Sequence, residues 1–378
     1  MVPGRRRVRF VVVVLGITAA GMSTFLPEGL ADAVARDLGT DVDRIHIATV
    51  VYSVAYAVCV PFTPVLGHRL SWRGVISIGA ALVVVAGVLG ALASTHGAFV
   101  ASRAIAAVGA ATLVPVLLSA AGAARRSGTA TGVAFAVLAG ATSFTPDMAR
   151  AFVNRIPWQL LLMAPALISV AAVLVAFAVR GATTDRAHRP EPARYLGTLA
   201  TCGFWLLLTA ISMASAYTVF GRSDELATDV GSDVAGPAVF GAGGVAATLL
   251  VGLVLQNRNP ERLLVGTLTV LCLVFLGFVA LTHVEVGWAA SAGLLFGVWG
   301  AATWSISPVI QQSLLRAAGL DGAIAVGLNA SALYIGIGAG TMLGALSPTI
   351  TVGLLLAVLL SALAALTVLI RSRIVQLP

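Results

Sequence analysis

The stretch Phe99-Val-Ala-Ser-Arg103-Ala-Ile-Ala-Ala-Val-Gly109-Ala-Ala places one arginine inside an otherwise apolar segment. A guanidinium stays protonated in essentially every protein environment. A charge at the centre of a lipid bilayer costs about 2.5 to 17 kcal/mol, depending on the reference state, so it normally faces a bundle interior or a watery cavity and has a partner there. The segment therefore predicts a membrane helix with Arg103 on its inner face.

The composition of the whole chain is typical of an integral membrane protein. Apolar residues make up 59% of the 378 residues and charged residues only 10%, which is more apolar than a soluble domain of this length requires. The 40 glycines suit helices that pack closely through small side chains. A transmembrane β-barrel would show short alternating segments, whereas the apolar runs here are long and uninterrupted. We therefore expect an all-α integral membrane protein.

Apolar runs of about 20 residues, the length that crosses a bilayer, recur along the chain between charges, Pro or Gly. They predict twelve transmembrane helices, and we interpret the arginines that precede the first run as its cytoplasmic anchor and not as part of a signal peptide. The approximate ranges are 9–30, 45–66, 74–94, 98–121, 129–152, 157–179, 196–220, 235–256, 263–282, 287–310, 323–345 and 351–370.

The distribution of the arginines predicts the orientation of these helices. All 23 basic residues are Arg, and with both termini in the cytoplasm seventeen of them lie in inner segments and five in outer ones. This positive-inside pattern predicts a multi-pass protein of the cell (inner or plasma) membrane with both termini in the cytoplasm. It also explains the net charge of +8 without a nucleic-acid partner.

The longest polar inner segment runs from Arg180 to Arg194 and contains two prolines. It predicts a linker between two halves of six helices each. The expected domains are an N-terminal half (1–180), a cytoplasmic linker (181–195) and a C-terminal half (196–378). Transporters built from two parallel repeats have this organisation, with the substrate site near the bilayer midplane between the halves.

Four segments carry short motifs. They are Ser23-Thr-Phe-Leu-Pro27-Glu28-Gly29-Leu30 with the following Asp37-Leu38-Gly39, Arg103-Ala-Ile-Ala-Ala-Val-Gly109, Pro157-Trp158-Gln159, and Gly327-Leu-Asn329-Ala-Ser331 with the following Gly336, Gly338 and Gly340. These motifs resemble those of the major facilitator superfamily, in particular the twelve-helix drug:proton antiporters and their chloramphenicol- and arabinose-efflux-like exporters. The resemblance covers essentially the whole chain. It implies two six-helix halves around a central cavity, and proton-coupled efflux of small hydrophobic or amphiphilic compounds by alternating access.

Two motifs depart from the family pattern. The loop after the second span usually reads Gly-x-Leu-Ala-Asp-Arg-x-Gly-Arg-Arg, and this chain has Gly67-His-Arg69-Leu-Ser-Trp72-Arg73-Gly, with Trp72 at the acidic position. Gly67, Arg69 and Arg73 remain candidates for a gating loop, since the arginines can bind lipid phosphate or a helix end. The fifth span keeps a proline but lacks the Gly pair that ends the family's antiporter motif.

Three ionisable residues are candidates for a proton-coupling or substrate site. Arg103 and Asp147 each lie about five residues, or roughly 7 to 8 Å, below the outer surface, and Glu28 lies somewhat shallower. A carboxyl group that exchanges a proton beside a fixed cation is what a proton-coupled carrier needs, so we expect Arg103 to pair with Asp147 or Glu28. The alternatives are a structural ion pair, a Glu28 that reaches water, and an Asp147 that pairs only with Arg150 on its own helix face.

The predicted spans of the C-terminal half contain no carboxylate, Arg or Lys, so coupling is expected in the N-terminal half. A largely apolar cavity with few fixed charges favours a neutral or weakly charged amphiphilic substrate. For most of the candidate lining residues, core packing, interface anchoring or a helix-to-helix hydrogen bond is the alternative role. The candidates are Tyr52, Tyr56, Tyr217, Trp299, Trp304, Gln311 and Asn329.

Other classes of function lack their motifs. The five histidines show no metal-ligand spacing, which argues against a membrane enzyme, and there is no Gly-x-x-x-x-Gly-Lys motif for an ATP-driven pump. We expect no cofactor, and as partners a small-molecule substrate, protons and membrane lipid, with the chain acting as a monomer. An uptake carrier or facilitator of a small solute, or a non-transporting receptor or scaffold of the same fold, are the alternatives.

Overall fold

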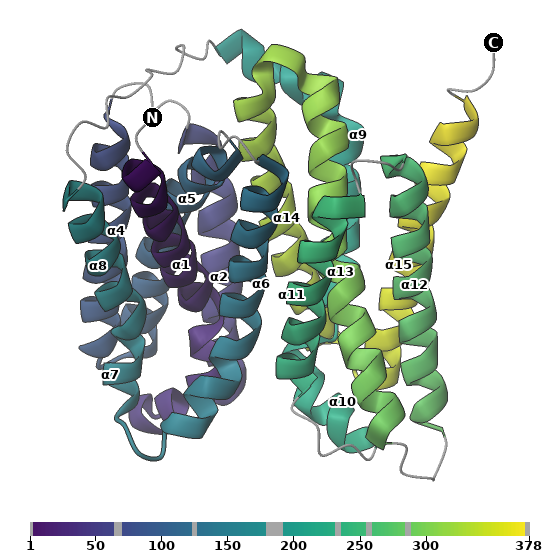
Figure 1. Cartoon of the computed structure of the whole chain (residues 1–378). Helices are drawn as coiled ribbons and strands as arrows, with labels where there is room; N and C mark the ends of the chain where they lie inside the picture. The colour runs from purple at the N-terminus through teal and green to yellow at the C-terminus, as the bar shows by residue number, and fades with distance from the viewer. Residues whose placement is uncertain are drawn as a thin grey trace. The chain divides into compact units, whose positions relative to one another are not determined.

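The computed structural model describes residues 3–63, 70–122, 127–178, 192–230, 236–254, 259–283 and 289–374. Every regular element in these ranges is a helix, so the all-α prediction is confirmed (Figure 1). The elements are α1 (Pro3–Leu38), α2 (Val42–Cys59), η1 (Val60–Phe62), α4 (Trp72–Ala91), α5 (His96–Gly122), α6 (Ser127–Phe152), α7 (Trp158–Leu162), α8 (Ala164–Ala178), α9 (Pro192–Tyr217), η2 (Phe220–Arg222), α10 (Ser223–Asp229), α11 (Gly236–Val254), α12 (Pro260–Leu281), α13 (Ala289–Ala318), η3 (Gly319–Asp321), α14 (Gly322–Leu346) and α15 (Ile350–Ile374).

Ten helical stretches in the described ranges are long and apolar enough to cross a membrane. The helices α6 and α11 fall at the two further predicted spans, but they are not among those ten, so the count of twelve stays a prediction. Large apolar side chains on the helix exteriors are exposed, such as Leu174 at 66% and Leu359 at 63%. Exposed apolar faces on long helices fit a lipid environment, where each helix satisfies its own backbone groups.

The first helix is longer than the apolar run that predicted it. The run ends near residue 30, whereas α1 continues to Leu38 and ends at Gly39, whose φ of +60° is the left-handed conformation that terminates many helices. The same signal follows α13, where Gly319 has a φ of +55°. Apolar runs report the part of a helix that lies in lipid, and these two helices continue through polar residues until a glycine ends them.

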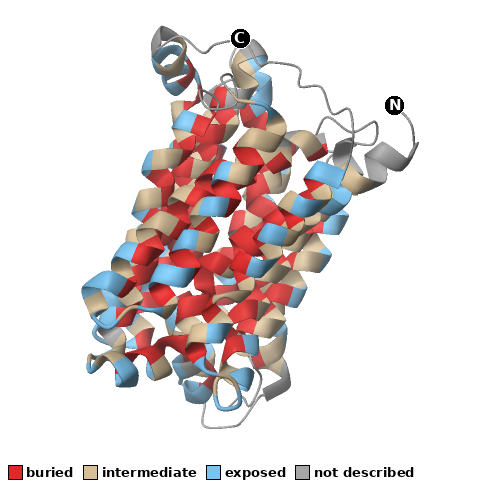
Figure 2. Cartoon of the chain, turned by 90° about the vertical axis from the view of Figure 1, so that its left-hand side faces the viewer, coloured by how far each residue is buried: buried red, intermediate tan, exposed pale blue. Residues whose placement is uncertain are grey.

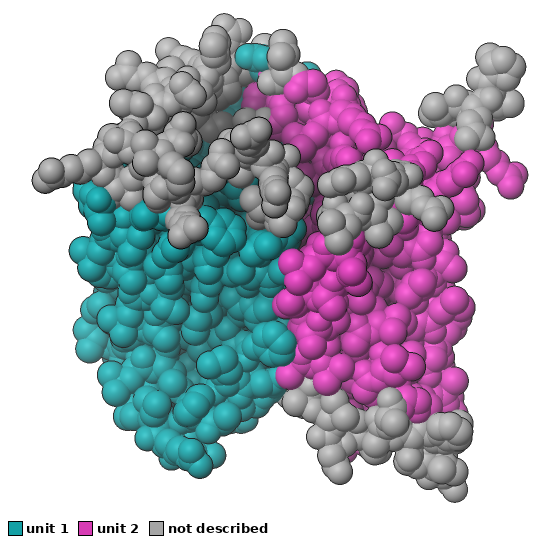
Figure 3. Space-filling view, in the orientation of Figure 1, with its two compact units in different colours: residues 1–197, 326–331 teal, residues 198–325, 332–378 magenta. Residues whose placement is uncertain are grey.

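The chain divides into two compact units, which Figure 3 shows in teal and magenta. Unit 1 consists of residues 1–197 with 326–331, and unit 2 of residues 198–325 with 332–378. The predicted domain boundaries stay a prediction, because most of the predicted linker, residues 181–191, lies outside the described residues.

Unit 1 is organised around α1, which packs against α2, α5, α6 and α8. Buried residues run along the helices in Figure 2 and form two apolar clusters. One contains Val12, Val13 and Ile17 with side chains from α4, α5, α6 and α8. The other surrounds the C-terminal part of α1, where Gly29 approaches α6 so closely that a Cβ on it would lie 2.2 Å from the carbonyl oxygen of Pro146. This close approach fixes α1 beside α6 next to Glu28.

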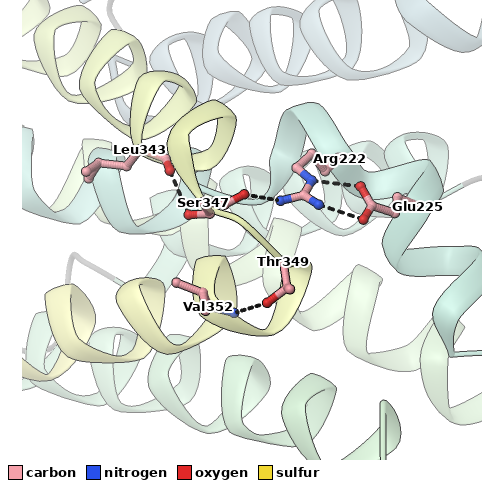
Figure 4. A network of polar contacts seen from close by, with 6 residues as sticks. All are labelled: Arg222, Glu225, Leu343, Ser347, Thr349 and Val352. Atoms are coloured by element: carbon pink, nitrogen blue, oxygen red, sulfur yellow. Dashed lines mark hydrogen bonds and ion pairs between the residues drawn. The ribbon is translucent and has the colours of Figure 1, made fainter.

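Unit 2 packs through aromatic rings and close helix contacts. The helices α11 and α13 touch at Gly300, where a Cβ would lie 1.8 Å from the carbonyl oxygen of Phe240. At one end of the unit Arg222 holds Glu225 through two hydrogen bonds, of 2.7 and 2.6 Å, and donates a third, of 3.1 Å, to the carbonyl oxygen of Ser347 (Figure 4). Arg222 thus ties η2, which follows α9, to the turn between α14 and α15.

Candidate functional site

Arg103 lies inside unit 1, with 3% of its surface exposed, as its sequence context predicted. Its Nη2 donates to the backbone carbonyl oxygen of Ser23 on α1 and lies 3.5 Å from the Ser23 hydroxyl oxygen. Its Cζ lies 5.4 Å from the centre of the Tyr52 ring on α2. Arg103 therefore links three helices, α1, α2 and α5, through a buried positive charge.

The carbonyl that Arg103 contacts is free because of a proline. In an α-helix the N–H of residue 27 would bond to the carbonyl of residue 23, but Pro27 has no N–H. A buried carbonyl without a donor is costly, and in a membrane helix a neighbouring side chain commonly supplies one. Arg103 supplies it here, while its own Nε has no hydrogen-bond partner in the part of the chain that the structure describes.

Tyr52 and Tyr56 lie on α2 beside this arginine. Their exposed fractions are 0% and 1%, and their rings are stacked with centres 6.4 Å apart. Thr24 donates a hydrogen bond of 3.3 Å to the Tyr52 hydroxyl. In this conformation both tyrosines pack inside unit 1, and a role for them in lining a cavity stays a prediction.

Glu28 does not pair with Arg103 but with the start of α2. Its Oε2 lies 2.5 Å from Nδ1 of His46, and its Oε1 accepts a hydrogen bond from the Thr49 hydroxyl. The side chains of Glu28 and His46 are 14% and 30% exposed. No sequence pattern joins His46 to Glu28, because the two residues lie on different helices and the five histidines show no metal-ligand spacing.

Asp147 has a cation on its own helix. Its Oδ1 lies 2.6 Å from Nη2 of Arg150, three residues later on α6. Among the described residues Arg103 forms no ion pair with either carboxylate, so the expected pair is absent from this structure. The reason is geometric, because Glu28 meets an imidazole and Asp147 meets a neighbouring guanidinium on the same helix face.

Of the three candidate gating-loop residues, Gly67 and Arg69 lie outside the described residues. Arg73 lies in the first turn of α4, and its Cζ is 5.6 Å from the centre of the Phe177 ring. Trp72, which occupies the acidic position of the family motif, has the Cζ of Arg9 at 5.7 Å from its ring centre. A cation over an aromatic face thus stands where the family pattern has a carboxylate.

Two segments that carry the family resemblance meet in unit 1. Asp37, near the end of α1, accepts hydrogen bonds of 2.9 Å from Trp158 and 3.0 Å from Gln159 at the start of α7. The Trp158 ring packs edge-on against Phe99 at 6.1 Å. The contact ties the end of α1 to the start of α7.

The candidate lining residues of unit 2 are mostly enclosed by packing. Trp299 is 0% exposed, and its ring meets five phenylalanine rings at 5.0 to 6.1 Å. Tyr217 lies 5.1 Å from one of these rings, that of Phe220, and Trp304 packs onto Gly244. Gln311 is partly buried. Asn329 is 5% exposed and belongs to the segment 326–331 that groups with unit 1.

Comparison with known proteins identifies the family. The family model described as Major Facilitator Superfamily matches residues 11–341. Chloramphenicol efflux pumps of two strains of Mycobacterium tuberculosis are 27% identical to this chain over 345 residues, which cover 85% of this chain and 81% of each pump.

Solved structures show the same fold. The human organic anion transporter MFSD10 aligns with a TM-score of 0.70 at 15% identity, over 97% of this chain and 100% of its own. The xylose transporter XylE from E. coli, in a partially occluded inward-open conformation, aligns with a TM-score of 0.70 at 14% identity, over 96% of this chain and 97% of its own.

Proposed function

We propose that this chain, which belongs to the major facilitator superfamily, exports small hydrophobic or amphiphilic compounds from the cell in exchange for protons. The family match over residues 11–341 indicates a membrane-embedded transporter of small molecules and not an enzyme. Direction, substrate class and proton coupling are the parts that we propose.

The proposal that the chain exports an amphiphilic compound is supported mainly by its similarity to efflux pumps. The chain is similar to chloramphenicol efflux pumps over 85% of its length, so the similarity extends through both compact units. The scarcity of charged residues, 10% of the chain, also suits a substrate without strong charge. Chloramphenicol is therefore the first compound to test.

Proton coupling is supported by the polar groups of unit 1. The buried charge of Arg103 is costly to keep inside a membrane protein, and intramembrane ionisable residues usually serve a transported ion or substrate. Glu28 and Asp147 lie on two helices, α1 and α6, that pack against each other. We propose that these three residues form the coupling machinery, and that the tyrosines, tryptophans and amides named above line the substrate path.

The proposed architecture is twelve membrane helices as two six-helix halves, 1–180 and 196–378, around a central cavity. Both termini lie in the cytoplasm, as the arginine distribution predicts, and the chain acts as a monomer in contact with lipid and without a cofactor. Uptake or facilitated diffusion of a small solute, and a receptor role without transport, are the alternatives.

Accumulation of labelled chloramphenicol tests the proposal. In cells that lack their own drug exporters, the chain should lower accumulation, and a protonophore should abolish the difference. Cells that carry the empty vector are the control. Higher accumulation with the chain would indicate uptake, export that ignores the protonophore would exclude proton coupling, and no effect across a panel of amphiphilic drugs would contradict drug export.

A further inference from the structure

The contact between Glu28 and His46 joins two titratable side chains from different helices. The carboxylate oxygen and the ring nitrogen are 2.5 Å apart, which places them in direct hydrogen-bond contact. Thr49, less than one helical turn after His46, donates to the other carboxylate oxygen. Glu28 therefore has one oxygen held by a neutral hydroxyl and the other directed at an imidazole.

We propose that Glu28 and His46 bind the transported proton as a pair, with His46 as a second proton-binding residue. The inference rests on the proposed proton-coupled export and names the site of its proton. An ionised Glu28 that accepts a hydrogen bond from Nδ1–H of a neutral His46 carries, with it, a net charge of −1. One added proton, taken up at Nε2 of the imidazole, makes the pair neutral and leaves the hydrogen bond between Nδ1 and Oε2 in place. The proton comes from water on one side of the membrane and returns to water on the other.

The other candidate groups are less suited to this exchange. Asp147 already forms a neutral pair with Arg150 without any proton. Arg103 keeps its charge and has a backbone carbonyl and an aromatic ring as neighbours instead of a carboxylate. Imidazole is the side chain whose ordinary titration falls between pH 5 and 8, so a pair that contains it changes charge under physiological gradients.

Both side chains of the pair keep part of their surface accessible for proton exchange, since that of Glu28 is 14% exposed and that of His46 is 30% exposed. The short helices α7 and α8 carry no ionisable side chain, and α4 carries only Arg73. The other charged or titratable side chains that the structure describes on α1, on α2 and on the helices packed against them are Arg9, Asp32, Arg36, Asp37, Arg44, Tyr52, Tyr56, Cys59, His96, Arg103, Asp147 and Arg150. Several of them contact partners other than Glu28 and His46: Arg36 the carbonyl of Asp32, His96 the carbonyl of Arg44, Arg103 the carbonyl of Ser23, Arg150 the carboxylate of Asp147, and Asp37 the ring N–H of Trp158.

Nitrogen NMR of the full chain in lipid nanodiscs, labelled with 15N in its five histidines, tests the pair without any substrate. The variant His46→Asn identifies the His46 signals. In the wild type the chemical shifts of these signals should change with pH. Glu28→Gln should displace the midpoint of that change by about one pH unit or more, because an opposite charge at contact distance shifts a titration by about 1 to 3 units.

The matched control is Asp32→Asn, which removes the same charge one helical turn from Glu28 on an exposed position. It should leave the His46 midpoint within a few tenths of a pH unit. Unchanged histidine signals elsewhere in Glu28→Gln would show that this variant is folded. A His46 midpoint that is the same with and without Glu28, or that Asp32→Asn displaces equally, would overturn the pair.

Transport of chloramphenicol into inside-out vesicles separates this inference from the proposed function. We expect His46→Asn to lose the stimulation by a pH gradient that the wild type shows. Linked titration without any chloramphenicol transport in the wild type would contradict the proposed function and leave the proton-binding pair in place. Gradient-driven transport that His46→Asn leaves unchanged would contradict the role of His46 and leave the proposed function in place.

Discussion

Among the prolines inside the helices of unit 1, Pro27 and Pro115 each free a backbone carbonyl that a side chain from another segment satisfies, and the two side chains differ in kind. Pro27 in α1 frees the carbonyl of Ser23, and the charged Arg103 on α5 donates to it. Pro115 in α5 frees the carbonyl of Ala111, and the neutral hydroxyl of Thr63 donates to it at 2.9 Å. Both donors are buried, with 3% and 5% of their surfaces exposed.

The two donors differ in charge, and the comparison shows which part of the Arg103 contact the backbone requires. Thr63 shows that one hydroxyl is enough to satisfy a carbonyl freed by a proline in this fold. An arginine that donates to such a carbonyl also loses the hydration of its charge, which costs free energy. In addition, the Nε of Arg103 has no hydrogen-bond partner among the described residues. The positive charge at position 103 therefore exceeds what the backbone requires, which supports a role in transport.

The largest expected effect is that of Arg103→Leu. Loss of the donor leaves the Ser23 carbonyl unpaired, so unfolding of the purified protein should be easier by about 1 to 3 kcal/mol, and proton-driven chloramphenicol export should be lost. Thermal unfolding in detergent and vesicle export measure the two effects. In the double variant with Pro27→Ala, the helix can again satisfy Ser23 itself, so stability should recover and export should not. Recovery of both would show that Arg103 is only structural.

The sequence predicted the helices and the burial of Arg103 for physical reasons that act locally. A bilayer sets the length of an apolar run, and a lone arginine in such a run has to be enclosed. The partner of Arg103 was not predicted, because a buried cation is expected beside a carboxylate, and Arg103 donates to a backbone carbonyl instead. Pro27, four residues after Ser23, was the available signal, since every helical proline frees the carbonyl four residues before it.

The pairing of Glu28 with His46 was beyond the sequence for another reason. The two residues are 18 positions apart on helices joined by the turn at Gly39. Whether they meet depends on how α1 and α2 are rotated about their axes. Apolar residues are spread almost evenly around the circumference of each of these two helices. The sequence pattern therefore does not predict which face of one helix contacts the other. The same holds for Trp299, because a tryptophan in a span is compatible with a cavity wall and with the aromatic core in which its ring packs here.

A smaller effect is expected for Thr63→Val at the second proline. Valine has the shape of threonine without the hydroxyl, so the Ala111 carbonyl loses its donor while the packing stays similar. Unfolding should be easier by about 1 to 2 kcal/mol, and export should persist in those molecules that remain folded. Thermal unfolding and vesicle export of this variant are measured beside those of Arg103→Leu. If Thr63→Val also abolished export, the contrast between the two donors would be refuted.

The smallest effect sharpens the comparison and needs no transport assay. Pro115→Ala restores an N–H at position 115, so the Ala111 carbonyl can accept a hydrogen bond within α5. Thr63→Val should therefore cost about 1 kcal/mol less in the Pro115→Ala background than in the wild type, and a double-mutant cycle of unfolding free energies measures this difference. The cycle cancels whatever Pro115→Ala does to the bend of the helix on its own. If Thr63→Val lowered the unfolding free energy equally in both backgrounds, Thr63 would stabilise unit 1 by packing and not by its hydrogen bond. Thr63 would then no longer be an uncharged donor with which Arg103 can be compared.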